Sequence, residues 1–309
     1  MDILQERPDI VIRILARPEQ GSLSVAIAEA TAVVLVMEQP ALTAEMIRRA
    51  PSLRVACRCG AGYDNFDVEA LTRRGIPLTT SGAANAATVA EHAVYFIFAL
   101  AKRGPYFDRS VKRGNWKREF GSIELFGRTC LIVGFGRIGK EIGTRVAALG
   151  MRVLVFDPHC PKSTIDRSGY LSVPSLEVGL PEADFVVLAC ALTDQTRGLI
   201  DETNISRMKK SAFVVNIARG PVIDNDALRN ALADGRIAGA GLDVLQTEPP
   251  SLDDPLLQMD QVILSPHIGS YIESAFDRIA IAAARMTLAG LDGRLSAEDV
   301  VNPEVFTHG

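Results

Sequence analysis

The feature that most constrains the fold is a glycine-rich turn between an apolar strand and a helix. Leu131-Ile-Val-Gly134-Phe-Gly136-Arg-Ile-Gly139-Lys140 places three glycines at the spacing G-x-G-x-x-G. In such a turn the first glycine permits a tight bend, the second lets the backbone approach a pyrophosphate, and the third lets the helix pack closely against the strand. The following helix, expected over residues 138–149, would direct its free N–H groups at the phosphates. The turn therefore predicts a dinucleotide-binding domain.

An acidic residue at the end of the next strand indicates which dinucleotide is bound. Asp157 follows Val153-Leu-Val-Phe156 and lies 18 residues after Gly139. A carboxylate at this position accepts hydrogen bonds from a ribose 2′-hydroxyl and repels a 2′-phosphate. The sequence therefore favours NAD over NADP.

Short β-branched runs alternate with amphipathic stretches along the chain, which is typical of an α/β fold with parallel sheets. Two long apolar helices, expected over residues 85–102 and 272–291, bracket the middle of the chain. We therefore predict two Rossmann-like, doubly wound domains, with an NAD-binding domain at residues 99–286 inserted into a smaller, flavodoxin-like substrate domain at residues 1–98 and 287–309. Strands are expected at residues 10–15, 33–37, 54–57, 75–80, 130–133, 152–156, 185–189, 213–216, 239–243 and 262–265.

Composition argues against several other classes of protein. The net charge of −4 favours neither nucleic acid nor anionic lipid as a partner, and no apolar run approaches the length of about 18 residues that a membrane helix needs. The five cysteines form no C-x-x-C pair, so neither a metal site nor a disulfide framework is expected. The first residues, with acids and an early proline, do not resemble a signal peptide, and we expect a cytoplasmic protein.

Three polar residues follow successive expected strands. Arg219, Glu248 and His267 each come after an apolar run, and parallel strands bind ligands at their carboxyl ends. Arginine suits a substrate carboxylate, imidazole suits proton transfer, and a glutamate beside it stabilises the imidazolium. The other histidines, at positions 92, 159 and 308, are interpreted as a structural helix residue, a surface residue and a frayed terminal residue.

These stretches together resemble the D-2-hydroxyacid dehydrogenase family over about residues 33 to 303. The resemblance implies that Arg219 binds the substrate carboxylate, that His267 is the acid/base and that Glu248 tunes it. It also implies a homodimer, a small 2-hydroxy or 2-keto acid as substrate, and a further set of cofactor contacts. The motifs that carry it are Asn216-Ile-Ala-Arg-Gly, Leu242-Asp-Val-Leu-Gln-Thr-Glu-Pro and Leu264-Ser-Pro-His-Ile-Gly, behind the glycine turn. The implied cofactor contacts are Gly134, Gly136, Arg137, Ile138, Gly139, Asp157, Cys190, Ile217, Ala218 and Asp243.

The segment Arg58-Cys-Gly-Ala-Gly-Tyr-Asp-Asn resembles the loop of the family's small domain whose backbone holds the substrate carboxylate. Gly60, Ala61 and Gly62 would supply that backbone. In the phosphoglycerate dehydrogenase branch an arginine matching Arg58 helps to bind a distal substrate charge, whereas the alternative is an ion pair with a nearby acid such as Asp64.

The sequence departs from the family at two places. The chain before the strand at residues 33–37 is short, so the small domain is expected to have fewer strands, and alanines at positions 189 and 191 replace a common histidine and proline. The expected activity is NAD-linked interconversion of a D-2-hydroxy acid and its 2-keto acid. 3-Phosphoglycerate, glyoxylate, hydroxypyruvate and a bulkier anionic acid stay open as substrates. The alternatives are an NADH-responsive co-repressor on the same scaffold and a formate- or phosphite-type dehydrogenase.

Overall fold

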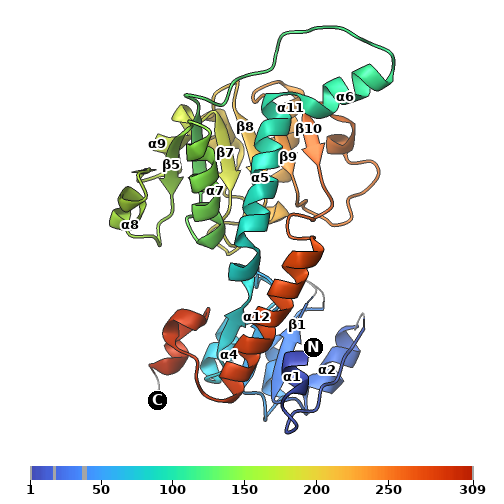
Figure 1. Ribbon diagram of the computed structural model, residues 1–309, viewed down its shortest axis with the longest axis vertical. Coiled ribbons are helices and arrows are strands. Elements are labelled where there is room, and N and C mark those ends of the chain that lie inside the picture. Colours follow the sequence, from blue (N-terminus) through green and yellow to red (C-terminus); the bar gives the residue numbers. More distant parts are fainter. Residues whose placement is uncertain (1, 17–18, 37–39, 308–309) are drawn as a thin grey trace. The chain divides into compact units, whose positions relative to one another are not determined.

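The computed structural model describes residues 2–16, 19–36 and 40–307, and the chain divides into two compact units. One unit is continuous and comprises Ala86–Tyr271, whereas the other combines Met1–Asn85 with Ile272–Gly309. The larger unit is therefore inserted into the smaller one (Figure 1).

The larger unit contains a sheet of seven parallel strands among the described residues, in the order β10-β9-β8-β7-β4-β5-β6. The order reverses between β4 and β7, the arrangement of a doubly wound Rossmann sheet, whose ligands bind at the carboxyl ends of the strands beside the reversal. The strands are β4 (Thr129–Val133), β5 (Arg152–Phe156), β6 (Leu171–Ser172), β7 (Phe185–Leu188), β8 (Phe213–Asn216), β9 (Gly239–Leu242) and β10 (Val262–Leu264).

Alternate residues of each central strand enter different cores, because successive side chains of a strand point to opposite faces. Cys130 and Ile132 pack in the core beneath α5 (Ala86–Ala101) and α7 (Arg137–Ala148), whereas Leu131 and Val133 pack in the other. Helices α9 (Leu176–Gly179), α10 (Glu202–Ser206) and α11 (Asn225–Ala233) contribute to the second core. The unit also contains α6 (Gly104–Lys112) and α8 (Lys162–Arg167). Helices cover both faces of the sheet, and the central strands β4 and β7 are therefore buried along their whole length.

Helix α5 is the main core helix of the larger unit. It packs against α7, β8, β9 and β10, and Phe96 lies so close to Gly241 that a Cβ there would come within 2.7 Å of the ring. The stretch Gly82–Ala101 is long and apolar enough to cross a membrane by length and composition alone. With 56% of that stretch buried inside the structure, its apolar surface is used mainly for packing.

The smaller unit contains three parallel strands among its described residues, in the order β1 (Ala32–Leu35), β2 (Val55–Arg58), β3 (Leu78–Thr80). Helices α2 (Gln20–Ile27), α3 (Ala44–Arg48) and α4 (Val68–Arg73) share one core with these strands, and α12 (Glu273–Leu291) packs on β2 and β3. At Gly290 of α12 a Cβ would come within 2.4 Å of the Val55 side chain, so the glycine permits this close helix packing.

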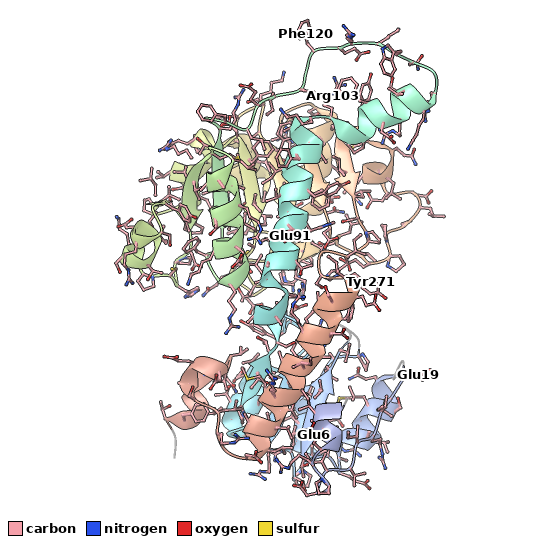
Figure 2. The ribbon with its side chains drawn as sticks, in the orientation of Figure 1. Glu6, Glu19, Glu91, Arg103, Phe120 and Tyr271 are labelled. Carbon is pink, nitrogen blue, oxygen red and sulfur yellow. The ribbon has the colours of Figure 1, made fainter. Side chains whose placement is uncertain are left out.

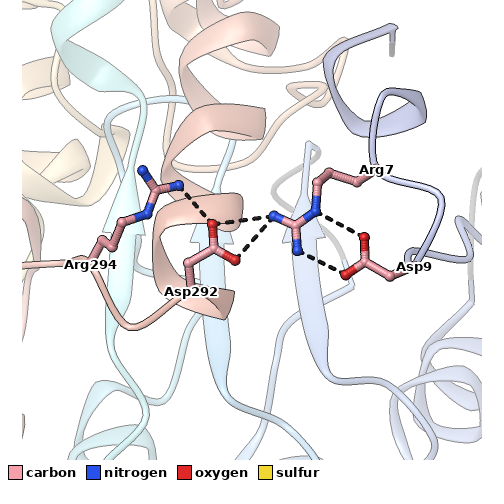
Figure 3. Close-up of polar contacts among 4 residues, drawn as sticks. All are labelled: Arg7, Asp9, Asp292 and Arg294. Atoms are coloured by element: carbon pink, nitrogen blue, oxygen red, sulfur yellow. Dashed lines mark hydrogen bonds and ion pairs between the residues drawn. The ribbon is translucent and has the colours of Figure 1, made fainter.

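The N-terminal segment is joined to the end of α12 by a chain of ion pairs (Figure 3). Helix α1 (Asp2–Gln5) precedes Arg7, whose guanidinium donates to Asp9 at 2.8 Å and to Asp292 at 3.0 Å. Arg294 and then Arg7 hold the pKa of the Asp292 carboxyl below its usual value. Because these side chains are exposed, the chain of ion pairs orients the segment and adds little stability.

Most predicted elements are confirmed within a few residues, but the strand predicted at residues 10–15 is wrong. This segment is irregular, with Val11 96% and Ile14 63% exposed, and β1 is the outermost strand of the sheet. The β-branched apolar run indicated a strand, but the segment pairs with no strand in the described part of the chain. The three strands also follow sequence order, so the reversal expected of a doubly wound sheet occurs only in the larger unit.

The domain boundaries differ from those expected from the sequence. The predicted limits at residues 98 and 287 cut through the two long helices, whereas the structure divides the chain before α5 and before α12. Each helix packs along its length within one unit, α5 in the larger and α12 in the smaller. A helix whose contacts lie with one core along its length belongs to the domain built on that core.

Candidate active site

The three glycines of the turn after β4 have three different surroundings. A Cβ at Gly134, where φ is +95°, would lie 2.7 Å from the Cys190 backbone nitrogen, and a Cβ at Gly139 would lie 2.1 Å from the Gly134 carbonyl oxygen. A Cβ at Gly136 would meet no heavy atom within 4 Å. The first and third glycines are thus required by the protein's own packing, whereas the second leaves open space in front of α7.

That open space lies at the amino end of α7, where Gly136 is the N-cap and Arg137 is the first helical residue. Both residues are exposed, and the first turn of α7 carries no acidic side chain. Free N–H groups, the helix dipole and an arginine together favour a bound anion. Ile138, half-buried, follows on the same turn. The residues present therefore fit the pyrophosphate of NAD.

Asp157 at the end of β5 is hydrogen-bonded to the same turn. Its Oδ2 accepts from the Phe135 N–H at 2.7 Å, and its Oδ1 accepts from the N–H groups of His159 at 2.8 Å and Cys160 at 3.1 Å. These bonds hold the carboxylate, which is half-buried, beside the glycine turn, where the ribose contact is expected. Because a carboxylate has more acceptor positions than these three bonds use, Asp157 can also accept a hydrogen bond from a ribose hydroxyl.

Cys190 follows β7, which lies beside the reversal of the sheet, and Ile217 and Ala218 follow β8, the next strand. Ile217 and Ala218 are each 7% exposed, and the backbone of Cys190 contacts Gly134 closely enough to exclude a side chain there. Burial raises the pKa of the Cys190 thiol to about 11, so the thiol is protonated at neutral pH. All three predicted contacts therefore lie beside the glycine turn or at a neighbouring strand end.

The imidazole of His267 is hydrogen-bonded to the carboxylate of Glu248. Nδ1 of His267 lies 2.8 Å from Oε2 of Glu248, and Oε1 accepts from the Leu245 N–H at 3.0 Å. Burial opposes ionisation of Glu248, but its hydrogen bonds to His267 and Leu245, with the charges of His267 and Arg219, hold its pKa below the usual value. Glu248 is therefore ionised at neutral pH and stabilises a protonated His267.

Arg219 follows β8, and its side chain donates to the Ala218 carbonyl at 2.8 Å. Asn216 orients the loop, since its Nδ2 donates to the Arg219 carbonyl at 2.9 Å and its Oδ1 accepts from the Ala218 N–H at 3.0 Å. Gly220 comes next, and a Cβ there would lie 2.0 Å from the Leu245 carbonyl oxygen. The Arg219 loop therefore contacts the segment that leads to Glu248, consistent with the effect of the Arg219 charge on Glu248.

Asp243 follows β9 and holds the 265–269 turn, which carries His267. It is 4% exposed, and its carboxylate accepts from the N–H groups of Ile268 and Gly269, each at 2.9 Å. Burial opposes its ionisation, but the nearby His92 ring and the hydrogen bonds from Ser265, Ile268 and Gly269 hold its pKa below the usual value. Asp243 thus has a positioning role that the sequence did not indicate, and its contact with the nicotinamide carboxamide stays a prediction.

In the smaller unit, Arg58 at the end of β2 is 4% exposed and supports the loop that follows it. Its guanidinium donates to the carbonyls of Gly62 at 2.9 Å, Leu35 at 3.2 Å and Val36 at 2.5 Å. Gly60, with φ +143°, donates its N–H to the Ser81 hydroxyl at 2.9 Å, and Ala61 contacts Gly82. Arg58, which was expected to bind a substrate charge, therefore holds the predicted substrate loop through its hydrogen bond to the Gly62 carbonyl.

The larger unit thus brings together Arg219, Glu248 and His267, while Arg58 and residues 60–62 belong to the smaller unit. Sequence reasoning missed Asn216, Gly220, Ser265 and the role of His92. Asn216, Gly220 and Ser265 lie within the motifs that contain Arg219 and His267, so their positions could have marked them as site residues. Nothing near His92 in the sequence indicates its partners. His308 lies outside the described residues.

Comparison with known proteins agrees with this geometry. The family model of the D-isomer specific 2-hydroxyacid dehydrogenase NAD-binding domain matches residues 94–269. D-3-phosphoglycerate dehydrogenase of Methanocaldococcus jannaschii is 40% identical over 87% of this chain and 51% of its own length. Glyoxylate reductase of Korarchaeum cryptofilum is 37% identical over 94% of this chain and 88% of its own length. D-lactate dehydrogenase from Aquifex aeolicus, solved with NAD and lactic acid, superimposes with a TM-score of 0.81 at 29% identity over 90% of this chain and 89% of that structure.

The chain belongs to the D-isomer specific 2-hydroxyacid dehydrogenase family and carries the family's NAD-binding domain. It spans about half the length of the Methanocaldococcus phosphoglycerate dehydrogenase that it matches.

The different surroundings of Gly136 and Gly139 give a first test of the cofactor site. Gly136→Ala should weaken NADH binding about tenfold or more and leave the melting temperature unchanged, because its methyl group would enter only the space for the pyrophosphate. Gly139→Ala is the matched control, and it should lower the melting temperature because its methyl group overlaps the Gly134 carbonyl. NADH fluorescence titration and thermal denaturation measure the two effects. Unchanged NADH affinity in Gly136→Ala would contradict this site.

Proposed function

We propose that the protein catalyses NAD-dependent interconversion of a D-2-hydroxy acid and its 2-keto acid. Bound at the glycine turn, NAD would supply or accept the hydride at C4 of its nicotinamide. His267 gives a proton to the keto oxygen during reduction and takes it back during oxidation, and Arg219 binds the substrate carboxylate. The observation that carries this proposal is the His267–Glu248 hydrogen bond of 2.8 Å, with the charge of Arg219 acting on the same glutamate.

The hydrogen bond to Glu248 determines which nitrogen of His267 can do the chemistry. Since Nδ1 faces an ionised carboxylate, Nδ1 carries a hydrogen and Nε2 is the atom that exchanges a proton with substrate. The carboxylate stabilises the imidazolium that delivers the proton, and it keeps the ring in one orientation. Arg219 offers a planar pair of donors that suits a carboxylate.

Substitution of His267 and Arg219 tests the roles proposed for these two residues. His267→Ala and Arg219→Ala should each lower kcat/KM for NADH-dependent reduction of a keto acid by about a hundredfold or more, because each removes a group that acts on the reacting centre. The affinity for NADH should stay within about twofold, since neither residue belongs to the glycine turn. Absorbance at 340 nm measures turnover, and fluorescence titration measures affinity. Wild-type turnover in His267→Ala would refute the role given to His267, and NADH binding without any turnover in the native protein would favour the co-repressor alternative.

For the substrate we propose a short 2-keto acid such as glyoxylate or hydroxypyruvate in preference to a phosphorylated acid. Arg58 was the residue expected to bind a second negative charge, but it is 4% exposed and donates to three backbone carbonyls. Moving its guanidinium to a phosphate would break all three hydrogen bonds, although the Leu35 carbonyl keeps a second donor, the Cys59 N–H; each broken bond costs about 0.5–1.5 kcal/mol. The match to a glyoxylate reductase covers 88% of that protein, against 51% of the phosphoglycerate dehydrogenase, and this supports the same choice.

A panel of substrates tests this choice. We expect kcat/KM for glyoxylate or hydroxypyruvate to exceed that for 3-phosphohydroxypyruvate by about tenfold or more, the discrimination of one unpaired charged group. Arg58→Met should lower the melting temperature by removing hydrogen bonds of a buried side chain. It should lower kcat/KM by the same factor for every substrate of the panel. A selective loss of the phosphorylated substrate in Arg58→Met, or a preference of the native enzyme for that substrate, would contradict the proposal.

We also propose that the protein is a homodimer and works in the cytoplasm. The larger unit exposes aromatic side chains on α5 and on the segment after α6, which arches away from the rest of that unit (Figures 1 and 2). These side chains are Tyr95, Phe98, Trp116, Phe120 and Phe126, with exposures of 50%, 39%, 79%, 104% and 79%. Several exposed aromatic side chains in one unit favour a protein partner, and a second copy is the partner that the family resemblance implies.

Charge placed in this surface should separate the two copies. Light scattering after size exclusion should give a dimer for the native protein and a monomer for Trp116→Glu combined with Phe120→Asp, because two buried charges oppose association. Leu252→Asp, at a residue that is 89% exposed in a different loop, is the matched control and should stay dimeric. A monomeric native protein would overturn the proposal.

A further inference from the structure

The turn that carries His267 contains a strained residue. His267 has φ +53°, and a non-glycine residue in the left-handed region costs about 1–2 kcal/mol. Such a conformation persists only where the surrounding contacts impose it. The contacts that impose it therefore decide where the imidazole stands.

Several of those contacts come from one residue, Asp243. Its carbonyl accepts the N–H of His267 at 2.8 Å, and its carboxylate accepts the N–H groups of Ile268 and Gly269. Oδ1 also accepts the hydroxyl of Ser265 at 2.5 Å. The end of β9 thus holds the 265–269 turn on both sides of His267, and the position of the Asp243 carboxylate fixes the position of the turn.

His92 of α5 completes this network from a distant part of the sequence. Its Nε2 lies 2.8 Å from the Ser265 hydroxyl oxygen and 3.3 Å from Oδ1 of Asp243. A hydroxyl has one hydrogen to donate, and that of Ser265 goes to Asp243. Ser265 must therefore accept from His92, so the network assigns the hydrogen of His92 to Nε2.

The ring of His92 is itself held in place by its neighbours on α5. It lies edge-on to Phe96 with ring centres 4.8 Å apart and stacks on Tyr95 at 5.7 Å. Phe96 is fully buried and packs against Gly241 of β9. The donor nitrogen is therefore fixed relative to β9, the strand that Asp243 follows.

We propose that His92 and Ser265 are positioning residues, which hold the Asp243 carboxylate against the 265–269 turn and so set the orientation of His267 for proton transfer. This inference rests on the proposed function, because it takes His267 as the acid/base. His92 acts only through Ser265 and Asp243. The sequence-based interpretation of His92 as a structural helix residue thus becomes a role in the site.

Two amide substitutions of His92 test the proposal in the full-length protein. Gln places its Nε2 amide near the position of the imidazole Nε2, whereas Asn is also polar but too short to reach Ser265. We expect His92→Asn to lower kcat for glyoxylate or hydroxypyruvate reduction about tenfold, the effect of one lost hydrogen bond, and His92→Gln to stay within about threefold of the native value. The solvent deuterium isotope effect on kcat should rise only in His92→Asn.

Coupling between the two residues provides a second measurement. If His92 acts through the Ser265 hydroxyl, the double variant His92→Asn/Ser265→Ala should be no slower than Ser265→Ala alone. Effects that multiply in the double variant, a native kcat in His92→Asn, or equal losses in the Asn and Gln variants would overturn the proposal.

Hydrogen exchange separates this inference from the proposed function. The backbone amides of Ile268 and Gly269 should exchange about tenfold faster in His92→Asn than in the native protein or His92→Gln, whether or not any keto acid is reduced. An inactive native protein with this exchange pattern would refute the function and leave the network in place. An active native protein whose Ile268 and Gly269 amides exchange equally in all three forms would refute the network.

Discussion

The parallel direction of the seven strands in the larger unit is the constraint on which its site depends. Parallel strands place all their carboxyl ends at one edge, so residues that follow different strands meet there although they are far apart in the chain. Arg219 follows β8, Asp243 follows β9 and His267 follows β10. The hydrogen bonds of the site then adjust positions that the sheet has already brought together.

Local pattern predicted the larger unit well because its signals are local. A buried parallel strand appears as a short β-branched run, and the spacing of Gly134, Gly136 and Gly139 follows directly from the turn that they form. The same reasoning failed at residues 10–15, because a β-branched run describes a segment's own preference and not whether another strand is there to pair with it. It also misplaced the domain boundaries, since the sequence of a long helix does not say which core its apolar face enters.

The candidate site could be predicted in part for a similar reason. Glu248 and His267 were found because each follows an expected strand, and the structure brings them within hydrogen-bonding distance. His92 was missed because a histidine within an apolar helix is usually interpreted as a core residue, and its partner Ser265 is 173 residues away. The hydrogen bonds of Arg58 to backbone carbonyls were not predicted, since sequence gives the charge of a side chain and not the groups that surround it.

The division of the chain into a continuous and a discontinuous unit affects how the protein is made. Residues of the smaller unit leave the ribosome first, but α12, which packs on β2 and β3, is synthesised only after the whole larger unit. The larger unit can therefore complete its core during translation, whereas the apolar faces of β2 and β3 stay uncovered until α12 is synthesised. The order of assembly is thus the reverse of the order in which the two units begin.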